Sequence, residues 1–407
     1  MTASPRVALF CETYHEINGV ALTARQLVAY AKRKRLPLLA IHGGKLPGTS
    51  DEESVRRVEL RRAWASIGIE SDLEYDFFFW RYRNSIREEV QKFRPDVIHI
   101  TSPGELGQLG VYLSRKLKIP LVASWHTNFH QFAARRLRKA IGFAPRSLKD
   151  PVEAWAQDRG LQILLWFYGF AAVTLAPTPQ QVEWLEKELQ RPSFLMPRGV
   201  DAEQFHPKHR TAKDNVLRLG FVGRVTPEKG VRLLREVERA LEAQGFLDFR
   251  VVVVGDGSEL GWLKRRLRHA EFTGVLRGEE LARAYANMDL FVFPSRTDTF
   301  GNVVQEAAAS RVPAVVTNEG GPKNLVVAGT TGYVAATNEE FLARVVELAR
   351  DATLRGRMGQ AARERVAGVS WDAAFAETYS AYRAACIPAE HRTRDEGGDC
   401  LENWGNV

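Results

Sequence analysis

Short apolar runs alternate with longer segments of helical periodicity along most of this 407-residue chain. The runs are typical of buried strands in a parallel sheet, because helices cover both faces of such a sheet. Five of them fall in each half: 7–10, 36–41, 96–102, 120–126 and 171–177, then 217–223, 249–255, 271–276, 289–295 and 312–318. Two sets of five predict an α/β protein with two doubly wound, Rossmann-like domains.

The chain is too long for one ordinary hydrophobic core, and a polar stretch separates the two sets of strands. This stretch, 197–215, contains two prolines and no sustained periodicity. We expect a first domain over 1–200 and a second over 201–370. The amphipathic segment 371–387 predicts a helix that packs back on the first domain, and the polar segment 388–407 predicts a disordered tail.

The composition is that of a soluble globular protein, with 45% hydrophobic and 26% charged residues. The most apolar segment, 161–177, is shorter than the roughly 18 residues of a membrane-spanning helix and is interpreted as a helix end followed by a strand. The amino terminus lacks the pattern of a signal peptide. Because Cys11, Cys386 and Cys400 have no disulfide or metal-binding spacing, we expect a cytoplasmic protein.

The net charge is +8, and the segment 134–149 contributes six basic residues with no acidic one. Apolar residues interrupt the charges, so a helix here would have a basic, partly apolar face. Such a face suits the anionic inner surface of a membrane. The residues that would contact the membrane or a lipid acceptor are Arg135, Arg136, Arg138 and Lys139. A solvated helix face beside an anionic substrate site is the alternative. Nucleic-acid binding is disfavoured, because no aromatic-basic module or zinc spacing accompanies the charge.

Two carboxylates follow the apolar run 289–295. Asp298 lies in the loop after the run, and Glu306 lies on the helix that is predicted next. Open α/β sheets bind ligands at the carboxyl ends of their strands, so this loop is a candidate ligand site. A capped helix with a solvated glutamate is the alternative.

Two cations follow the run 217–223, namely Arg224 in the loop and Lys229 at the start of the next helix. An arginine fork and a lysine point charge suit a phosphate or diphosphate, to which helix amides add attraction. Ordinary surface charge is the alternative. The glycines of 251–263 match only half of a dinucleotide fingerprint, and no acidic residue closes the next strand, which disfavours a nicotinamide dehydrogenase.

Two features of the first half are weaker signals. Gly19 follows Asn18 in the loop after the first strand, where backbone can approach a ligand closely. His126 ends an apolar strand and suits substrate hydroxyls or a developing charge, with a core histidine as the alternative. His130 follows four residues later, but no carboxylate or cysteine joins the pair to suggest a metal.

The order of six motifs is more specific than any one of them. The motifs are NGVA (18–21), PRGVDAEQFHP (197–207), FVGRVTPEKG (221–230), VVVVGDG (251–257), FTGVLRGEELARAYANMDLFVFPSRTDTFGNVVQEAAAS (272–310) and EGGPKNLV (319–326). In this order they resemble the retaining glycosyltransferases of family 4, in particular the mannosyltransferase-like and lipid-glycosylating subgroup. The resemblance implies a GT-B fold, in which two Rossmann-like domains face each other across a cleft.

The resemblance also implies roles for individual residues. Asp298 matches the family's first carboxylate, which contacts donor-sugar hydroxyls, and Glu306 matches the second, which contacts the ribose. Arg224 and Lys229 match the cations that hold the donor diphosphate, and Gly19 matches a glycine whose amide faces it.

Three further sets of residues match in the same way. His126 matches the active-site histidine near the donor sugar. The loop whose amides face phosphate and sugar comprises Thr299, Phe300, Gly301 and Asn302. The strand end that holds the nucleobase comprises Val275, Leu276 and Arg277.

The implied reaction is transfer of a hexose with retention of anomeric configuration to a lipid or glycan acceptor. GDP-mannose is the favoured donor and a UDP-sugar the second choice; no metal or other cofactor is expected, since no Asp-x-Asp motif is present to hold one. One departure is Arg311, where the family usually has glycine. This departure keeps a non-catalytic binding relative as an alternative, and a GT-B fold epimerase that acts on the sugar nucleotide is another. Donor binding without transfer would identify the first, and incubation with donor alone the second.

Overall fold

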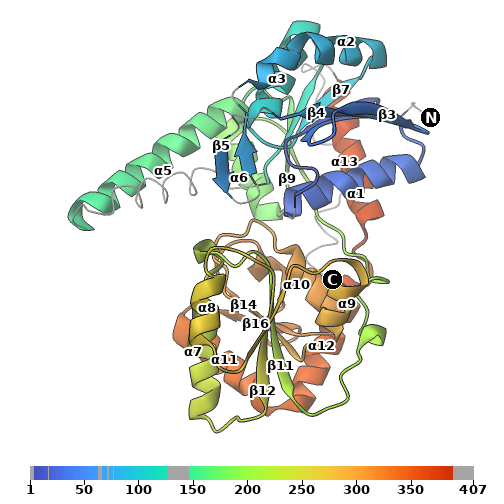
Figure 1. The fold of residues 1–407 in the computed structure, drawn as a ribbon. Coiled ribbons are helices and arrows are strands. Elements are labelled where there is room, and N and C mark those ends of the chain that lie inside the picture. The colour runs from blue at the N-terminus through green and yellow to red at the C-terminus, as the bar shows by residue number, and fades with distance from the viewer. Residues whose placement is uncertain are drawn as a thin grey trace. The chain divides into compact units, whose positions relative to one another are not determined.

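The computed structural model describes residues 4–16, 18–62, 67–70, 73–76, 78–126 and 146–387 (Figure 1). The chain forms two compact units, described separately below. The first unit comprises Met1–Pro197 together with Trp371–Val407, and the second comprises Arg198–Ser370.

The described part of the first unit is built on an eight-stranded sheet in the order β10-β9-β8-β7-β1-β2-β4-β3. Its strands are β1 (Val7–Cys11), β2 (Leu38–Gly44), β3 (Gly48–Glu52), β4 (Val55–Arg61), β7 (Val97–Ile100), β8 (Leu121–Ser124), β9 (Val173–Ala176) and β10 (Ser193–Leu195). All neighbouring pairs are parallel except β3 and β4. The strand order reverses between β1 and β7, as in a doubly wound fold.

Helices connect these strands. They are α1 (Gly19–Arg33), η1 (Phe79–Tyr82), α2 (Arg83–Phe93), α3 (Glu105–Leu117), α5 (Arg146–Tyr168), α6 (Pro179–Leu189) and α13 (Trp371–Cys386). A separate hairpin pairs β5 (Ile67–Glu70) with β6 (Leu73–Tyr75).

The second unit, described throughout, has a six-stranded parallel sheet in the order β13-β12-β11-β14-β15-β16. Its strands are β11 (Leu217–Val222), β12 (Phe249–Val254), β13 (Ala270–Gly274), β14 (Leu290–Phe293), β15 (Ala314–Thr317) and β16 (Gly332–Ala335). Numbered within the unit, this is the order 3-2-1-4-5-6 of a dinucleotide-binding fold.

Helices cover the second sheet as well. They are η2 (Pro207–His209), η3 (Pro227–Lys229), α7 (Leu233–Ala243), α8 (Leu260–Arg266), α9 (Gly278–Ala286), α10 (Asn302–Ala309), η4 (Pro322–Leu325), α11 (Asn338–Arg350) and α12 (Ala352–Val366). The strands β11, β12, β14 and β15 are largely buried, whereas β13 and β16 are partly exposed. Phe221, Phe291 and Phe293 lie in the core of the unit.

The predicted α/β class with two Rossmann-like sheets is confirmed, and each of the ten predicted strands is present. The sequence did not predict β3, because GTSDE is an exposed edge strand with no apolar residue. It also missed β4, where VRRVELR carries three arginines and a glutamate on the partly exposed positions of a strand near the sheet edge. The strand β10 has three residues, and β16 begins with glycine and is half-buried at its two central positions, so neither forms a clear apolar run.

The last described helix, α13, belongs to the first unit. Its buried face includes Phe375, Tyr379 and Tyr382, which lie in one hydrophobic cluster with residues of β1 and α1. Tyr382 also shares a hydrogen bond of 2.7 Å with His99 on β7. Polar contacts reach the helix start, where Arg33 pairs with Asp372 at 2.5 Å.

Some predictions fall outside the described residues: the tail 388–407, His130, and the four basic residues Arg135, Arg136, Arg138 and Lys139. Within the described part, no helix has the length and apolar character needed to cross a membrane.

Candidate functional site

The predicted donor residues of the second unit follow two strands that are neighbours in the sheet. Arg224 and Lys229 come after β11, whereas Asp298 and Glu306 come after β14. These two strands lie at the point where the strand order reverses, so their connections diverge to opposite faces and leave a crevice at their carboxyl ends. The fold thus brings two cations and two carboxylates to the position where such sheets bind ligands.

A short ion pair links the two connections. The Lys229 ammonium lies 2.5 Å from Oδ1 of Asp298, and both side chains are mostly shielded from solvent. Burial alone would raise the pKa of Asp298, but the charge and hydrogen bond of Lys229 outweigh it and lower that pKa. Asp298 is therefore a carboxylate at neutral pH, and both of its oxygens act only as hydrogen-bond acceptors.

Glu306 lies one turn inside α10. Its Oε2 accepts a hydrogen bond of 2.7 Å from the hydroxyl of Tyr285 on α9. Burial raises the pKa of Glu306 to about 7, although the hydrogen bond from Tyr285 opposes this. Glu306 thus changes its charge near neutral pH, and its free oxygen remains available to a ligand that donates hydrogen bonds.

Arg224 also lies in the β11 connection, where it pairs with a carboxylate of the same segment. Its Nη2 lies 3.5 Å from Oε1 of Glu228, which also accepts a hydrogen bond of 2.5 Å from the Thr226 hydroxyl. The Thr297 hydroxyl, in the β14 connection, donates to the backbone carbonyl of Glu228 at 3.2 Å. The two connections are therefore joined by hydrogen bonds as well as by the Lys229 ion pair.

The loop before α10 contains Thr299, Phe300, Gly301 and Asn302. Gly301 has a φ of 98°, and the Phe300 side chain is buried, so at these two positions only the backbone can contact a ligand. Two polar atoms of α10, Asn302 Nδ2 and Gln305 Oε1, are buried with no hydrogen-bond partner in the described chain. Together with the amides of the first helical turn, they are available to an anionic or polar ligand.

The glycines of EGGPKNLV explain how this loop is supported. The amide of Gly321 donates to the carbonyl of Asp298 at 2.7 Å. A Cβ on Gly321 would lie 2.1 Å from the Thr299 carbonyl oxygen, and one on Gly320 would lie 2.5 Å from that of Asp298. Side chains at either position would push the loop away, so this pair of glycines sets the position of Asp298.

The remaining residues of the second unit that the resemblance selected follow β13. Val275, Leu276 and Arg277 come directly after its last residue, Gly274, and Val275 is exposed. The second unit is described throughout, and it has no group of three histidine, cysteine or carboxylate side chains that lie close enough together to hold a metal ion.

Two predicted residues lie in the first unit. Gly19 is the first residue of α1, and the Asn18 side chain caps this helix by accepting a hydrogen bond of 2.9 Å from the Ala21 amide. His126 lies two residues beyond β8 and is 5% exposed. Both therefore follow carboxyl ends of strands in the first sheet.

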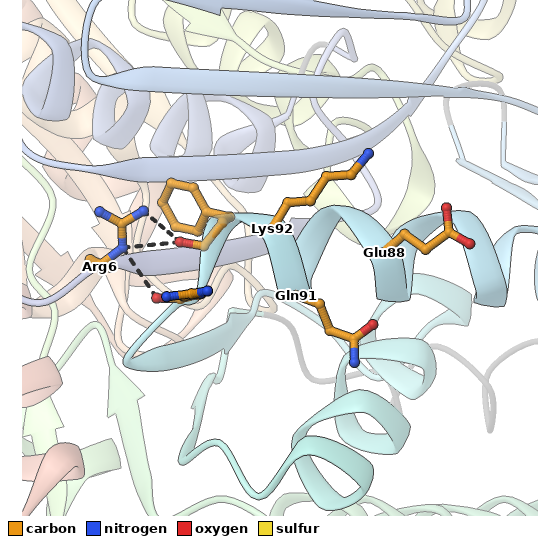
Figure 2. Close-up of a pocket in the computed structure, with 6 residues that line it drawn as sticks. Arg6, Glu88, Gln91 and Lys92 are labelled. Carbon is orange, nitrogen blue, oxygen red and sulfur yellow. Dashed lines mark hydrogen bonds between the residues drawn. The ribbon is translucent and has the colours of Figure 1, made fainter.

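A surface hollow in the first unit does not lie at the carboxyl ends of the strands, where open sheets bind ligands (Figure 2). Its residues come from the carboxyl end of α2 and from the segment before β1, that is, from the amino edge of the sheet. Figure 2 shows Arg6 donating hydrogen bonds to the backbone carbonyls of Phe93 and Arg94. Arg6 thereby satisfies the last carbonyls of α2, which is a structural role.

Comparison with known proteins agrees with the two-domain architecture. Residues 17–204 match a family model described as Glycosyltransferase Family 4, and residues 217–351 match one described as Glycosyl transferases group 1. A GDP-mannose-dependent alpha-mannosyltransferase of Mycolicibacterium smegmatis is 36% identical over 93% of this chain and 97% of its own length. One of the same name from Mycobacterium tuberculosis is 33% identical over 93% and 96%.

The chain belongs to glycosyltransferase family 4. The fold agrees: sucrose-phosphate synthase from Thermosynechococcus elongatus superimposes with a TM-score of 0.70 at 17% identity, covering 93% of this chain and 98% of that structure. At this identity the likeness shows the GT-B fold and nothing further.

Arg311, the departure from the family-4 pattern, has a φ of 64°. It follows the C-cap of α10, and the amides of Arg311 and Val312 bond to the carbonyls of Ala308 and Ala307. This is a common helix ending, in which glycine is preferred. The same backbone region is occupied by Arg94, Lys118 and other non-glycine residues elsewhere in the chain. The departure therefore affects a helix end rather than a ligand contact.

Sequence reasoning did not select Arg198 or Tyr285 as site residues of this family-4 chain. Arg198 is 5% exposed, its Nη1 bonds to Asn302 Oδ1 at 3.3 Å, and its guanidinium lies over the Phe300 ring. Burial lowers the pKa of Arg198 to about 10 although the charge of Asp298 opposes this, so it remains a cation. The motif PRGVD could have indicated Arg198 as a site residue. Nothing in the sequence indicated Tyr285, because a tyrosine on a helix is usually a packing residue.

Proposed function

We propose that this chain is a retaining mannosyltransferase that takes mannose from GDP-mannose and transfers it to a lipid or glycan acceptor. The observation that carries the proposal is the set of charges at the β11–β14 crevice, where Lys229 pairs with Asp298 and the charge of Arg224 also acts on Asp298. A nucleoside diphosphate sugar offers the matching groups: a doubly charged diphosphate between two sets of hydroxyls. The mannosyltransferase relatives, similar along nearly their whole length, favour GDP-mannose among such donors.

The cations act on the leaving group. As the bond between the anomeric carbon and the diphosphate oxygen breaks, negative charge builds up on the diphosphate. Arg224 and Lys229, with the amides at the start of α10, stabilise that charge where it develops. The acceptor hydroxyl oxygen forms the new bond on the face that the diphosphate leaves, and its proton passes to a diphosphate oxygen. This order of events gives retention and requires no metal ion or additional cofactor.

The two carboxylates position the donor. Glu306 accepts hydrogen bonds from the ribose hydroxyls through its free oxygen while Tyr285 holds the other. Asp298, kept ionised beside Lys229, accepts from hydroxyls of the sugar. In the first unit, Gly19 is assigned to the diphosphate and His126 to the transferred sugar. The segment Val275–Arg277 is assigned to the base.

The acceptor is proposed to be lipid-borne, which would bring this cytoplasmic protein to an anionic inner membrane surface. Besides the basic segment 134–149, the support comes from α5. Its side chains Trp155, Ile163 and Trp166 are 61%, 65% and 67% exposed. Their spacing of 8 and 11 residues places them within about 80° on one side of the helix. Exposed tryptophans next to basic residues are typical of helices that lie at a membrane surface. A soluble glycan is the alternative acceptor.

Thermal protection by a panel of nucleotide sugars tests the donor. At 100 times its dissociation constant, the true donor should add about 2.7 kcal/mol to the free energy of unfolding. GDP-mannose should protect more than GDP-glucose and more than UDP-glucose or UDP-galactose. Protection by UDP-sugars alone would replace the proposal with a UDP-sugar-dependent transferase. Conversion of the donor sugar in the absence of acceptor would indicate an epimerase, and protection without any transfer would indicate a binding protein.

A further inference from the structure

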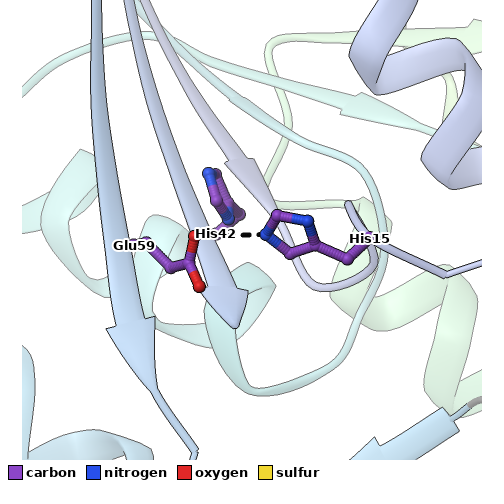
Figure 3. Close-up of side chains that lie close together, drawn as sticks. All are labelled: His15, His42 and Glu59. Atoms are coloured by element: carbon purple, nitrogen blue, oxygen red, sulfur yellow. Dashed lines mark hydrogen bonds and ion pairs between the residues drawn. The ribbon is translucent and has the colours of Figure 1, made fainter. Parts of the chain in front are cut away.

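Three metal-binding side chains come together in the first unit, at the edge where its strands end (Figure 3). His42 lies on β2 and Glu59 on β4, and the two are direct partners in the register of these parallel strands. His15 belongs to the loop after β1, the neighbour of β2 on its other side. Partners in register place their side chains on one face of a sheet, so the two strand residues face the same way and the loop residue reaches them.

The distances among these side chains approach those of a coordination sphere. One ligand atom from each residue lies within 4.8 Å of the other two, and His15 Nε2 is 3.2 Å from Glu59 Oε2. Ligand atoms about 2.1 Å from a tetrahedral ion are roughly 3.4 Å apart. The His15–Glu59 spacing therefore already fits, and the third ligand needs to move by at most about 1.5 Å.

Neighbouring groups hold each strand ligand in place. Glu59 Oε1 accepts a hydrogen bond of 2.9 Å from the Leu46 amide, which leaves Oε2 for an ion. The carboxylate fits there because position 44 is glycine: a Cβ on Gly44 would lie 1.9 Å from Glu59 Oε1. Second contacts of this kind orient ligands in metal sites.

His42 is held in a form that can bind a metal. Its ring stacks on Tyr14 at 4.2 Å, and its Nδ1 lies 3.3 Å from the carbonyl of Gly43, which favours a proton on Nδ1 and a lone pair on Nε2. Arg57, two residues before Glu59 on β4, pairs with Glu52.

We propose that His15, His42 and Glu59 form a binding site for one divalent metal ion of the zinc class. Two imidazoles and a carboxylate suit Zn²⁺, which in such sites keeps a fourth position for water or for an oxygen of a bound molecule. The ion would tie the loop after β1 to two rigid strands. This loop leads into α1 through Asn18 and Gly19, so metal binding would order the entry to that helix. The inference does not depend on which sugar or acceptor the chain uses.

Calorimetric titration of the metal-free full-length chain with Zn²⁺ tests the site, with Co²⁺ absorption as a report on tetrahedral geometry. We expect one ion per chain and a rise in melting temperature. His15→Ala should weaken Zn²⁺ binding by more than about tenfold, since even the outer contacts of metal ligands contribute tenfold or more. The His15 side chain is 55% exposed, so this variant should fold. Glu59→Gln, which keeps an acceptor for the Leu46 amide, should weaken binding as well.

His269→Ala is the matched control. His269 faces a carboxylate, Glu242, at 3.8 Å, but no third ligand joins the two in the described chain. This variant should bind Zn²⁺ like the wild type, with a tetrahedral Co²⁺ spectrum. Absence of one-to-one binding, or equal affinities for wild type and His15→Ala, would overturn the proposal.

Discussion

Lys229 Nζ and Asp298 Oδ1 lie 2.5 Å apart, so a cation that follows β11 is paired with the carboxylate that follows β14. Arg224 is likewise next to Glu228. The crevice therefore carries nearly balanced charges before a donor binds. An incoming diphosphate must compete with these carboxylates for the two cations, which favours a ligand that also offers hydroxyl groups to Asp298.

Replacing either cation should weaken the binding of phosphates selectively. Lys229→Ala and Arg224→Ala should each reduce the affinity for GDP or GDP-mannose by about 1.5–3 kcal/mol, the contribution of a charged hydrogen bond, and should change guanosine binding much less. Calorimetry with the three ligands measures the difference. Lys208→Ala, which removes an exposed lysine from its pair with Glu203, is the control. Equal losses for nucleoside and nucleotide would show that the cations do not face the phosphates.

Glu306 should make donor binding depend on pH near neutrality. Its pKa is raised by burial to about 7, so without donor the folded chain holds a proton that the unfolded chain loses at lower pH. This group therefore favours folding at acidic pH, and that contribution is lost as the pH rises through 7. Hydroxyl groups of the donor form stronger hydrogen bonds with the ionised form of Glu306. The affinity for donor should therefore rise between about pH 6 and 8.

Variants of Glu306 isolate this effect. Glu306→Gln should remove the pH dependence in that range, and Glu306→Ala should abolish transfer while leaving the fold intact, as checked by circular dichroism. Normal donor affinity in Glu306→Ala would contradict the assignment of Glu306 to the ribose.

Arg311→Gly should stabilise the chain without changing its activity. The residue has a φ of 64°, and glycine avoids a strain of about 1 kcal/mol in this region. Chemical denaturation should show the gain, while the affinity for donor stays the same. Arg94→Gly, at the left-handed C-cap of α2, should give a similar gain in the first unit. A change in transfer rate on Arg311→Gly alone would mean that the family-4 departure modifies the site.

Transfer from GDP-mannose should persist after thorough chelation. In the proposed reaction the diphosphate is neutralised by Arg224, Lys229 and helix amides, and the proposed zinc-class site uses none of these residues. Rates measured before and after treatment with a chelator make the comparison. Complete loss that Mg²⁺ or Mn²⁺ restores would contradict transfer without a metal.

Membrane binding should depend on the basic segment and on α5. Each cation near anionic lipid contributes up to about 1 kcal/mol, and salt weakens this attraction. We expect co-sedimentation with phosphatidylserine vesicles but not with neutral ones. Binding should be lost when Arg135, Arg136, Arg138 and Lys139 are replaced by Gln, and reduced when Trp155 and Trp166 are replaced by Ala.

A fourfold Gln variant in the second unit controls for the change in net charge. Its exposed positions are Lys213, Arg265, Arg268 and Arg357. It should bind vesicles like the wild type, and both fourfold variants should keep donor affinity. Binding that neither salt nor the first variant alters would make a soluble glycan the better acceptor.

Periodicity predicted the sheet strands that are buried and apolar, because burial on both faces leaves a continuous apolar run. It could not predict β3, the exposed edge strand, or its neighbour β4, because charged residues interrupt the apolar pattern of both segments. Asp298 and Glu306 could be proposed as site residues because strand ends and helix starts are visible in the sequence. The His15–His42–Glu59 cluster could not be predicted, because the pairing of β1, β2 and β4 brings its members together. Along the chain, His15 and His42 are 27 positions apart, and His42 and Glu59 are 17 apart.

The chain leaves the first unit at Pro197, builds all of the second, and returns with α13, whose Phe375 and Tyr382 complete a core begun by β1. On the ribosome, the first unit therefore emerges with an apolar surface that its own early segment cannot cover. The second unit is continuous and can close its core as it is made. We therefore expect the unit that is translated first to be the one that finishes folding last.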